Sequence, residues 1–374
     1  MSTNTMYVHS VGMLSSLSDA KNSSASSRAG ITRACPTDFE IEVADEFEMV
    51  PISGYPAYYL TQGFTELGRL SRLGGFALQD LFINAADSGA GGSEEIIANA
   101  AFVLNLASGY YQGFARQSSS ISDGEQLSDD LNYEDLKPLY AENAIPQMLL
   151  AAGIRRKPQI EKVVFAGDAG FSNVLTIANN IFETTDVAYC IVGGVDSMLE
   201  PDVIEATLQL GILKTENNAI GFMPGEGAAF LLLTKSPKQQ SSVTEVAGVF
   251  LEKDQASDFS NNHSFLAAQG LSKTILRALQ LSSDRNLQVF GNLNGTRDRA
   301  VEWSNCMVRL SAEMTIAEDI YPIASFGEIG AAYGFFSMVI AHCYFQEGYS
   351  NCNETLIWAI SENGFRASVL LRHS

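Results

Sequence analysis

The residue types that carry covalent catalysis are few in this sequence, and no spacing brings them together. The five cysteines are dispersed in a pattern that fits no metal site (Cys35, Cys190, Cys306, Cys343 and Cys352). Cys190 lies within an apolar run that indicates a strand, where a cysteine is usually a small buried apolar residue. Cys306 and Cys343 fall within predicted helices. The cysteines therefore predict neither a metal site nor a nucleophile, and we expect no cofactor.

The four histidines are equally dispersed (His9, His263, His342 and His373). Ser172 lies near the start of a predicted helix, but no histidine is placed to activate it, so a Ser-His-Asp arrangement has no support. The residues that could act as acid or base must therefore be sought among the carboxylates.

A glycine-rich stretch is the most distinctive local feature. Residues 220–230 read Ile-Gly-Phe-Met-Pro-Gly-Glu-Gly-Ala-Ala-Phe. Three glycines and a proline exclude an ordinary helix and indicate a shaped loop whose backbone passes close to another group. The apolar run 228–233 that follows is typical of a buried strand. The loop is either the rim of a site or a structural turn with a packed glutamate.

Hydrophobic periodicity predicts a repeated alternation of strands and helices, which is typical of βαβ units with helical cover. A polar break at 236–242 divides the chain into two halves, 1–240 and 241–374, which we expect to share helices between two sheets. The acidic run 37–48 indicates a solvated face, 51–56 an irregular segment and 116–135 an exposed excursion. The predicted strands are 6–12, 96–106, 162–166, 187–192, 228–233, 243–252, 287–291, 320–324, 355–360 and 367–371, and the predicted helices are 64–86, 141–152, 170–183, 201–210, 265–281, 297–310 and 329–345.

Composition excludes several classes of partner. The chain has 374 residues, of which 46% are hydrophobic and 18% charged, as expected for a globular protein with a large core. Its formal net charge of −20 argues against nucleic acid and anionic membrane as partners and permits a basic protein. No apolar run is long enough to span a bilayer, and no signal peptide is recognisable. We expect a cytoplasmic protein.

Four motifs, in order and spacing, resemble those of β-ketoacyl synthases, which have the thiolase fold. They are Val-Gly-Gly-Val-Asp-Ser at 192–197, the loop at 221–229, Asn-Gly-Thr at 294–296 and Gly-Glu-Ile-Gly-Ala-Ala-Tyr-Gly at 327–334. The resemblance implies an α/β thiolase fold, with five layers (αβαβα) built from two similar halves. It also implies that Phe222, Gly225, Gly227 and Gly330 line a pocket.

The same resemblance implies that the catalytic groups are replaced. These synthases use a cysteine at a helix N-terminus as the acyl nucleophile and two histidines that stabilise an enolate. Here the nucleophile position falls on Asp168, and the two histidine positions fall on Asn294 and Glu328. Asp168 and Glu328 could form an acid–base pair with separated pKa values. Alternatively, both carboxylates cap helices and Asn294 holds a turn, with Arg297 and Arg299 neutralising one carboxylate.

Three functional hypotheses follow. The motifs at 189–197, 294–303 and 327–332 are similar to degenerate thiolase-like bacterial proteins often encoded beside type VI secretion effectors, which implies a non-enzymatic chaperone or adaptor for a protein partner. A chain-length-factor-like subunit that pairs with an active ketosynthase is the second hypothesis. A divergent acyltransferase or hydrolase acting on acyl thioesters through Asp168 and Glu328 is the third. Acyl carrier protein is a further possible partner under the last two.

The fold also implies assembly. Thiolase-fold proteins are typically two-fold dimers, in which the strand before the nucleophile helix pairs across the axis. In this sequence that strand is 162–166, and an open edge of this kind favours pairing. We expect a homodimer, or a heterodimer if the partner is a ketosynthase.

Overall fold

The computed structural model describes residues 5–43, 48–123, 133–237, 242–254, 256, 259 and 268–374, and for 119–123 only the backbone. The predicted boundary at 240/241 and His263 lie outside these residues. The strands are β1 (Met6–Leu14), β2 (Cys35–Val43), β3 (Glu48–Gly54), β4 (Ala100–Leu106), β5 (Ile160–Phe165), β6 (Tyr189–Ser197), β7 (Glu226–Thr234), β8 (Thr244–Lys253), β9 (Asn286–Phe290), β10 (Thr315–Ile320), β11 (Glu354–Ile360) and β12 (Phe365–His373). The helices are α1 (Ala20–Arg28), α2 (Tyr58–Thr61), α3 (Glu66–Asp87), α4 (Ser93–Ala98), α5 (Tyr110–Asp123), α6 (Tyr133–Ala151), α7 (Gly170–Thr184), α8 (Pro201–Gln209), α9 (Gln269–Leu279), α10 (Arg297–Leu310), α11 (Ile323–Phe326) and α12 (Tyr333–Gln346), with single 3-10 turns η1 (Gly167–Ala169) and η2 (Gly330–Ala332).

Ten strands are hydrogen-bonded in the order β10-β9-β11-β12-β8-β1-β7-β6-β4-β5. The two halves have the same arrangement of strand directions. Each has three neighbouring parallel strands at its outer end and antiparallel strands toward the junction. They join where β1 pairs with β8 over only three residues, Met6 to Val8. The expected repeat of one α/β pattern is confirmed.

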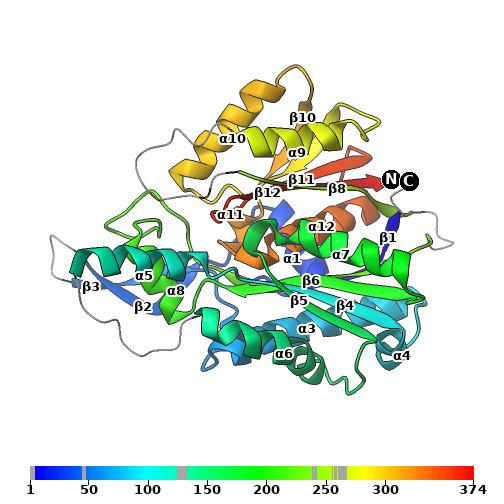
Figure 1. Ribbon diagram of the computed structural model, residues 1–374, viewed down its shortest axis with the longest axis horizontal. Coiled ribbons are helices and arrows are strands. Elements are labelled where there is room, and N and C mark those ends of the chain that lie inside the picture. The colour runs from blue at the N-terminus through cyan, green and yellow to red at the C-terminus, as the bar shows by residue number, and fades with distance from the viewer. Residues whose placement is uncertain are drawn as a thin grey trace.

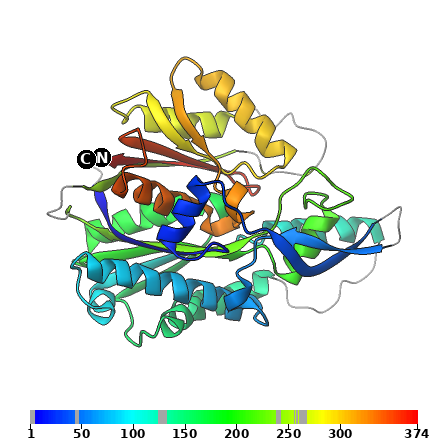
Figure 2. The same ribbon diagram turned by 180° about the vertical axis from the view of Figure 1, so that it is seen from behind.

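The helices form three layers around the two halves of the sheet (Figure 1, Figure 2). Helices α1, α7 and α12 lie between the halves, and α7 and α12 each contact strands of both. Helices α3 and α6 cover the outer face of one half, and α9 and α10 that of the other. From Tyr333 to Ala341 every residue of α12 is buried, as expected for a helix surrounded by protein. The expected αβαβα layering is therefore present.

The acidic segment forms a structure that its composition did not predict. Strands β2 and β3 pair as an antiparallel hairpin that projects from the body beside α5 and α8 (Figure 1). Asp38, Glu40 and Glu42 are exposed and alternate with half-buried apolar residues, so the solvated face was predicted correctly. The period of two, which favours a strand, was overlooked because of the charge. Residues 51–56 are likewise not irregular throughout, because β3 extends to Gly54.

Three other predictions need correction. The apolar run at 96–106 begins as helix α4, and the strand starts only at Ala100, because a short apolar run does not distinguish helix from strand. The predicted excursion at 116–135 contains the end of α5 and the start of α6, although 124–132 lie outside the described residues. The strand predicted at 320–324 is β10, which ends at Ile320, and 323–326 form α11.

Candidate functional site

The two central helices, α7 and α12, begin side by side, and the 3-10 turns that precede them, η1 and η2, are tied together. Asn105, at the end of β4, donates from Nδ2 to the carbonyl oxygens of Gly167 and Ala331, at 2.8 and 2.9 Å. Asp168 therefore precedes α7 at the point where Glu328 precedes α12. The sheet topology brings together two positions that are 160 residues apart in the chain.

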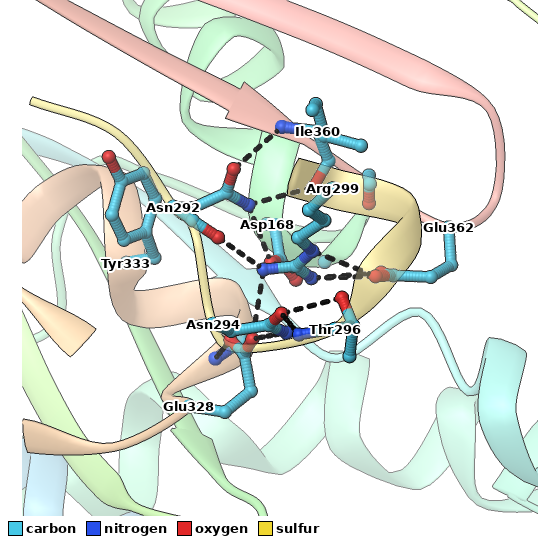
Figure 3. Close-up of polar contacts among 12 residues, drawn as sticks. Asp168, Asn292, Asn294, Thr296, Arg299, Glu328, Tyr333, Ile360 and Glu362 are labelled. Atoms are coloured by element: carbon cyan, nitrogen blue, oxygen red, sulfur yellow. Dashed lines mark hydrogen bonds and ion pairs between the residues drawn. The ribbon is translucent and has the colours of Figure 1, made fainter. Parts of the chain in front are cut away.

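Arg299 is the centre of this site (Figure 3). Its side chain comes from the first turn of α10 and is 1% exposed. Its Nη2 lies 2.7 Å from Asp168 Oδ2, and its Nη1 lies 2.9 Å from Glu328 Oε2. A third carboxylate, Glu362, accepts from Nε at 2.9 Å and from Nη2 at 3.0 Å. One guanidinium thus faces three carboxylates, in geometry that favours strong charge-assisted hydrogen bonds.

Two asparagines complete the network. Asn292 donates from Nδ2 to Asp168 Oδ2 at 3.0 Å, and its backbone carbonyl oxygen accepts from Arg299 Nη1. Asn294 donates from Nδ2 to Glu328 Oε2 at 2.6 Å, and its Oδ1 accepts from the backbone and the hydroxyl of Thr296. The predicted role of Asn294 in holding a turn is confirmed. The side chain of Asn294 is buried, and both its amide nitrogen and its amide oxygen already bind neighbouring protein groups.

Charge balance determines the protonation of the cluster. Burial raises the pKa of Asp168 well above its usual range, and the nearby Glu328 and Glu362 raise it further, against the opposing effects of Arg299 and Asn292. The pKa of Arg299 also lies well above its usual value, because the three carboxylates outweigh the effect of burial. Burial therefore favours the protonated form of Asp168 more than in an exposed aspartate, which would lessen the excess of negative charge around Arg299.

The capping prediction is partly wrong. Asp168 makes no cap to α7, whose N-cap is Ala169 with no side-chain hydrogen bond. Its carboxyl turns to Arg299 and Asn292 instead, because a buried charge pair is stronger than a cap to a neutral N–H. Glu328 does accept from the backbone N–H of Gly330, at 3.1 Å. Of the two predicted arginines, Arg299 reaches both carboxylates, whereas Arg297 is exposed.

The glycine-rich loop packs directly against this site. The backbone N–H of Gly225 donates to Glu328 O at 2.9 Å, and that of Glu328 donates to Met223 O at 2.8 Å. A Cβ at Gly225 would overlap the carbonyl oxygen of Phe326, which explains the glycine. Glu226 is fully buried and pairs with Arg69 Nε at 2.6 Å. The structural reading of the loop, a turn with a packed glutamate, is supported by this pairing.

The predicted pocket residues are not all at one cavity. A cavity of about 30 Å³ is lined by Asp168 and Gly330, together with Tyr111 and Glu362. Its lining, as far as the chain is described, does not include Phe222, Gly225 or Gly227. Phe222 is fully buried in an apolar cluster, with its ring 6.2 Å from that of Tyr111. Gly227 lets β7 approach Phe336 of α12.

The size of this cavity limits what can bind. A volume of about 30 Å³ holds a water molecule, whereas ligand pockets have roughly 300–1,000 Å³. Tyr111 Oη is buried without a hydrogen-bond partner among the described protein atoms, so a water here would satisfy it. A cleft of about 480 Å³ adjoins the cavity and shares Asp196 with it, but its lining includes neither Asp168 nor Glu328. An acyl thioester does not fit beside Asp168 in this arrangement.

Cys190, Cys306 and Ser172 are buried side chains in surroundings that do not activate them as nucleophiles. Burial raises the pKa of Cys190 to about 12 and that of Cys306 to about 11, so both thiols stay neutral. Ser172 Oγ donates to the carbonyl oxygen of Phe250 at 3.2 Å. Sequence reasoning missed Glu362 and Asn292, which belong to no recognised motif. The only available signal for Asn292 was its position two residues before Asn294, after a predicted strand.

Comparisons with known proteins agree with the fold described above. A family model described as the N-terminal domain of beta-ketoacyl synthase matches residues 169–239. No curated protein matches the chain. None of the helices in the described part of the chain is long and apolar enough to cross a bilayer.

Solved structures match along almost the whole chain. The complex of AntDE and AntF, a type II polyketide acyl-carrier protein with its ketosynthase, has a TM-score of 0.70 and 13% identity, with 99% of both chains covered. A β-ketoacyl synthase from Burkholderia phymatum STM815 has a TM-score of 0.66 and 15% identity, covering 99% of this chain and 100% of the other. The ishigamide ketosynthase/chain length factor has a TM-score of 0.64 and 15% identity, covering 98% of this chain and 99% of the other. The chain therefore has the mixed α/β thiolase-like fold of the ketosynthases.

Proposed function

We propose that this chain is a non-catalytic ketosynthase-like subunit that pairs with a second thiolase-fold chain, in the manner of a chain length factor. The observation that carries the proposal is the Arg299 network. It occupies the place where the family resemblance locates the nucleophile and both histidines, and it leaves about 30 Å³ beside Asp168. The side chains at this place bind one another and leave no room for an acyl group.

The rival proposal, catalysis by Asp168 and Glu328, has weaker support. A general acid and base must reach the substrate within hydrogen-bond distance. Both carboxylates instead bind the same guanidinium, at 2.7 and 2.9 Å, and Glu328 is fully buried. Releasing either one would leave a buried charge without its partner, which costs several kcal/mol.

The exposed edge of β5 supports pairing with another chain. Strand β5 is hydrogen-bonded to β4 on one side, and no strand in the described part of the chain borders its other side. Val163, Val164 and Phe165 are only partly buried. An open edge with apolar side chains favours addition of a strand from a partner. The solved structures titled ketosynthase/chain length factor are consistent with a ketosynthase as that partner.

Two measurements test the proposal. Incubation with acyl and malonyl thioesters should give neither an acyl adduct in the intact mass nor release of the thiol. Turnover that is lost in Asp168→Ala would refute the non-catalytic assignment. In sedimentation at micromolar concentration, Val164→Asp should weaken the self-association of the chain, or its association with a co-expressed ketosynthase. Val308→Asp, at a position on α10 that is 76% exposed, is the matched control and should have no effect.

The identity of the partner separates two versions of the proposal. Pull-down from the native host should recover a cysteine-bearing ketosynthase, with or without its acyl carrier protein. Recovery of a type VI secretion effector or adaptor would instead support the chaperone role implied by the family resemblance. The exposed carboxylates of β2 would then offer a contact for a basic partner, because opposite charges favour association.

A further inference from the structure

A cleft of about 480 Å³ lies beside the candidate site, between α5, the start of α6 and α8, and the start of α3 and the end of β6 also line it. Its volume falls within the range of ligand pockets, which is roughly 300–1,000 Å³. Asp196 is shared with the small cavity beside Asp168, but no residue of the Arg299 network belongs to the lining of the cleft. A ligand bound here would therefore be independent of the non-catalytic role proposed for that network.

Part of the lining is apolar and aromatic. Leu70, Tyr140 and Val203 are buried and line the cleft. The ring of Tyr133, whose hydroxyl donates to Ala107 O at 3.0 Å, packs edge-on against that of Tyr140, with the ring centroids 5.9 Å apart. Such a surface accepts the apolar body of a ligand, and the face of a tyrosine ring attracts a cation.

The charged part of the lining is predominantly acidic. It includes five carboxylates and one guanidinium (Glu66, Asp196, Glu200, Asp202, Glu205 and Arg116). Glu66, Asp202 and Glu205 are exposed, whereas Asp196 is buried and Glu200 is half-buried. Asp202 accepts a hydrogen bond from Gln112 Nε2 at 3.2 Å, which leaves its charge uncompensated. The lining therefore carries a formal excess of negative charge.

The neighbouring cations do not cancel this excess. Arg69 Nε lies 4.0 Å from Glu200 Oε1, but it pairs with Glu226 Oε2 at 2.6 Å. Lys137 Nζ lies 5.7 Å from the centroid of the Tyr133 ring and 2.5 Å from Glu134 Oε1. Glu226 and Glu134 are not part of the lining. Each cation thus forms a neutral pair with a carboxylate outside the cleft, and the five carboxylates of the lining remain in excess.

Glu200 is the carboxylate that most needs a partner. Its side chain is 12% exposed, and both carboxylate oxygens are buried with no donor in hydrogen-bond geometry among the described protein groups. Burial raises the pKa of Glu200 to about 7, against the opposing effects of the Glu66 backbone and of Arg69. Burial also raises the pKa of Asp196 to about 7, although it accepts from two backbone N–H groups. A cation in the cleft would stabilise both carboxylates, and perturbed acids in a pocket of this size are typical of a binding site.

We propose that this cleft binds an organic cation with an apolar body, of the class of primary alkylamines. The ammonium group would lie toward Glu200 and Asp202, and the alkyl chain would lie against Leu70 and Tyr140. A primary ammonium fits better than a quaternary one, because its three N–H donors match the carboxylate oxygens that lack a donor. A metal ion is not the expected ligand, because no group of three or more His, Cys, Asp or Glu side chains among the described residues is arranged to hold one.

Calorimetric titration of the full chain tests the charge and the apolar body of the ligand. Hexylamine should bind with one-to-one stoichiometry and a Kd of roughly 0.1–1 mM, which is reasonable for so few atoms. Hexanamide should bind more weakly, and hexanoate at least about tenfold more weakly, because the excess charge of the lining is negative. Methylamine should also bind at least about tenfold more weakly, because it lacks the alkyl chain. Equal affinity of the four probes, or no heat from hexylamine at ten times the expected Kd, would overturn the proposal.

Three isosteric variants test the location. Glu200→Gln should reduce hexylamine affinity more than about tenfold, because it removes the half-buried carboxylate that would bind the ammonium. Glu205→Gln, at an exposed position of the lining, should reduce it roughly two- to threefold. Glu313→Gln removes an exposed carboxylate outside the lining and is the matched control, which should leave the affinity unchanged. Circular dichroism of each variant confirms that the fold is intact.

Two outcomes of this series would overturn the proposal. Equal losses in all three variants would show that hexylamine responds to the overall charge of −20 and not to the cleft. Unchanged binding in Glu200→Gln would show that the probe binds elsewhere.

Discussion

Replacement of Arg299 by methionine should be the most destabilising single substitution in the candidate site. Methionine keeps much of the side-chain volume and removes the charge. Asp168, Glu328 and Glu362 would then remain buried or half-buried without their cation. Breaking a buried ion pair by removing one partner costs about 3–5 kcal/mol. Since burial raises the pKa of Asp168 and so favours its neutral form, most of the loss should come from the two glutamates, and we expect the free energy of unfolding to fall by about 3–5 kcal/mol.

The matched control is Asp168→Asn. Asparagine retains the shape of a protonated carboxyl and can still accept from Arg299, so it should cost less than about 1 kcal/mol. Urea unfolding followed by circular dichroism measures both variants against the parent chain. The defect of Arg299→Met should also shrink on going from pH 8 to pH 5.5, because the unpaired carboxylates can then take up protons.

Two results would refute this reasoning. A loss below about 1 kcal/mol for Arg299→Met would mean that the three carboxylates do not depend on Arg299 as partners in a buried ion pair do. A loss for Asp168→Asn as large as that for Arg299→Met would mean that Asp168 is ionised in the native state. In that case the inference that burial favours the neutral form of Asp168 would fail.

Three further predictions concern stability. Glu226→Ala should cost about 3–5 kcal/mol in urea unfolding, because it removes the carboxylate 2.6 Å from the buried Arg69 and leaves only Glu200, at 4.0 Å. A loss below about 1 kcal/mol would contradict a structural role. Gly330→Ala should be more destabilising than Gly167→Ala: both residues have positive φ, which costs about 1–2 kcal/mol in alanine, but only the Cβ at Gly330 would collide with Asp196. Equal melting temperatures of the two variants would disprove this. Burial raises the pKa of Asp196 and of Glu200 to about 7, so the native state binds more protons than the unfolded state. The stability contributed by these two groups is therefore complete below pH 4 and lost as the pH rises through 7, and a melting temperature that rises from pH 6 to pH 8 would contradict it.

The motifs predicted the meeting of Asp168, Asn294 and Glu328, but not what they do there. Their order along the chain was enough to place them, since each follows a strand of a repeated α/β pattern. Arg299 could be named as a neutralising group because it lies five residues after Asn294. Glu362 could not, because it belongs to the loop between β11 and β12 and reaches Arg299 only through the tertiary fold.

Local signals failed where tertiary contacts override them. The acidic residues of β2 concealed a strand, because charge was given more weight than the alternation beneath it. Asp168 was expected to cap α7, but its carboxyl instead accepts a hydrogen bond from Arg299, which lies on the distant helix α10.

The central position of β1 has a consequence for the order of folding. Its two neighbours in the sheet are β7 and β8, which follow it by more than 200 residues. At a synthesis rate of ~5–20 residues per second, the nascent strand waits roughly 10–40 s for its first partner. During this interval an apolar strand is exposed, and its backbone has no neighbouring strand with which to form hydrogen bonds. Loop closure over so long a segment is also slow. We expect the yield of the folded chain to depend on chaperones during synthesis more strongly than its final stability would indicate.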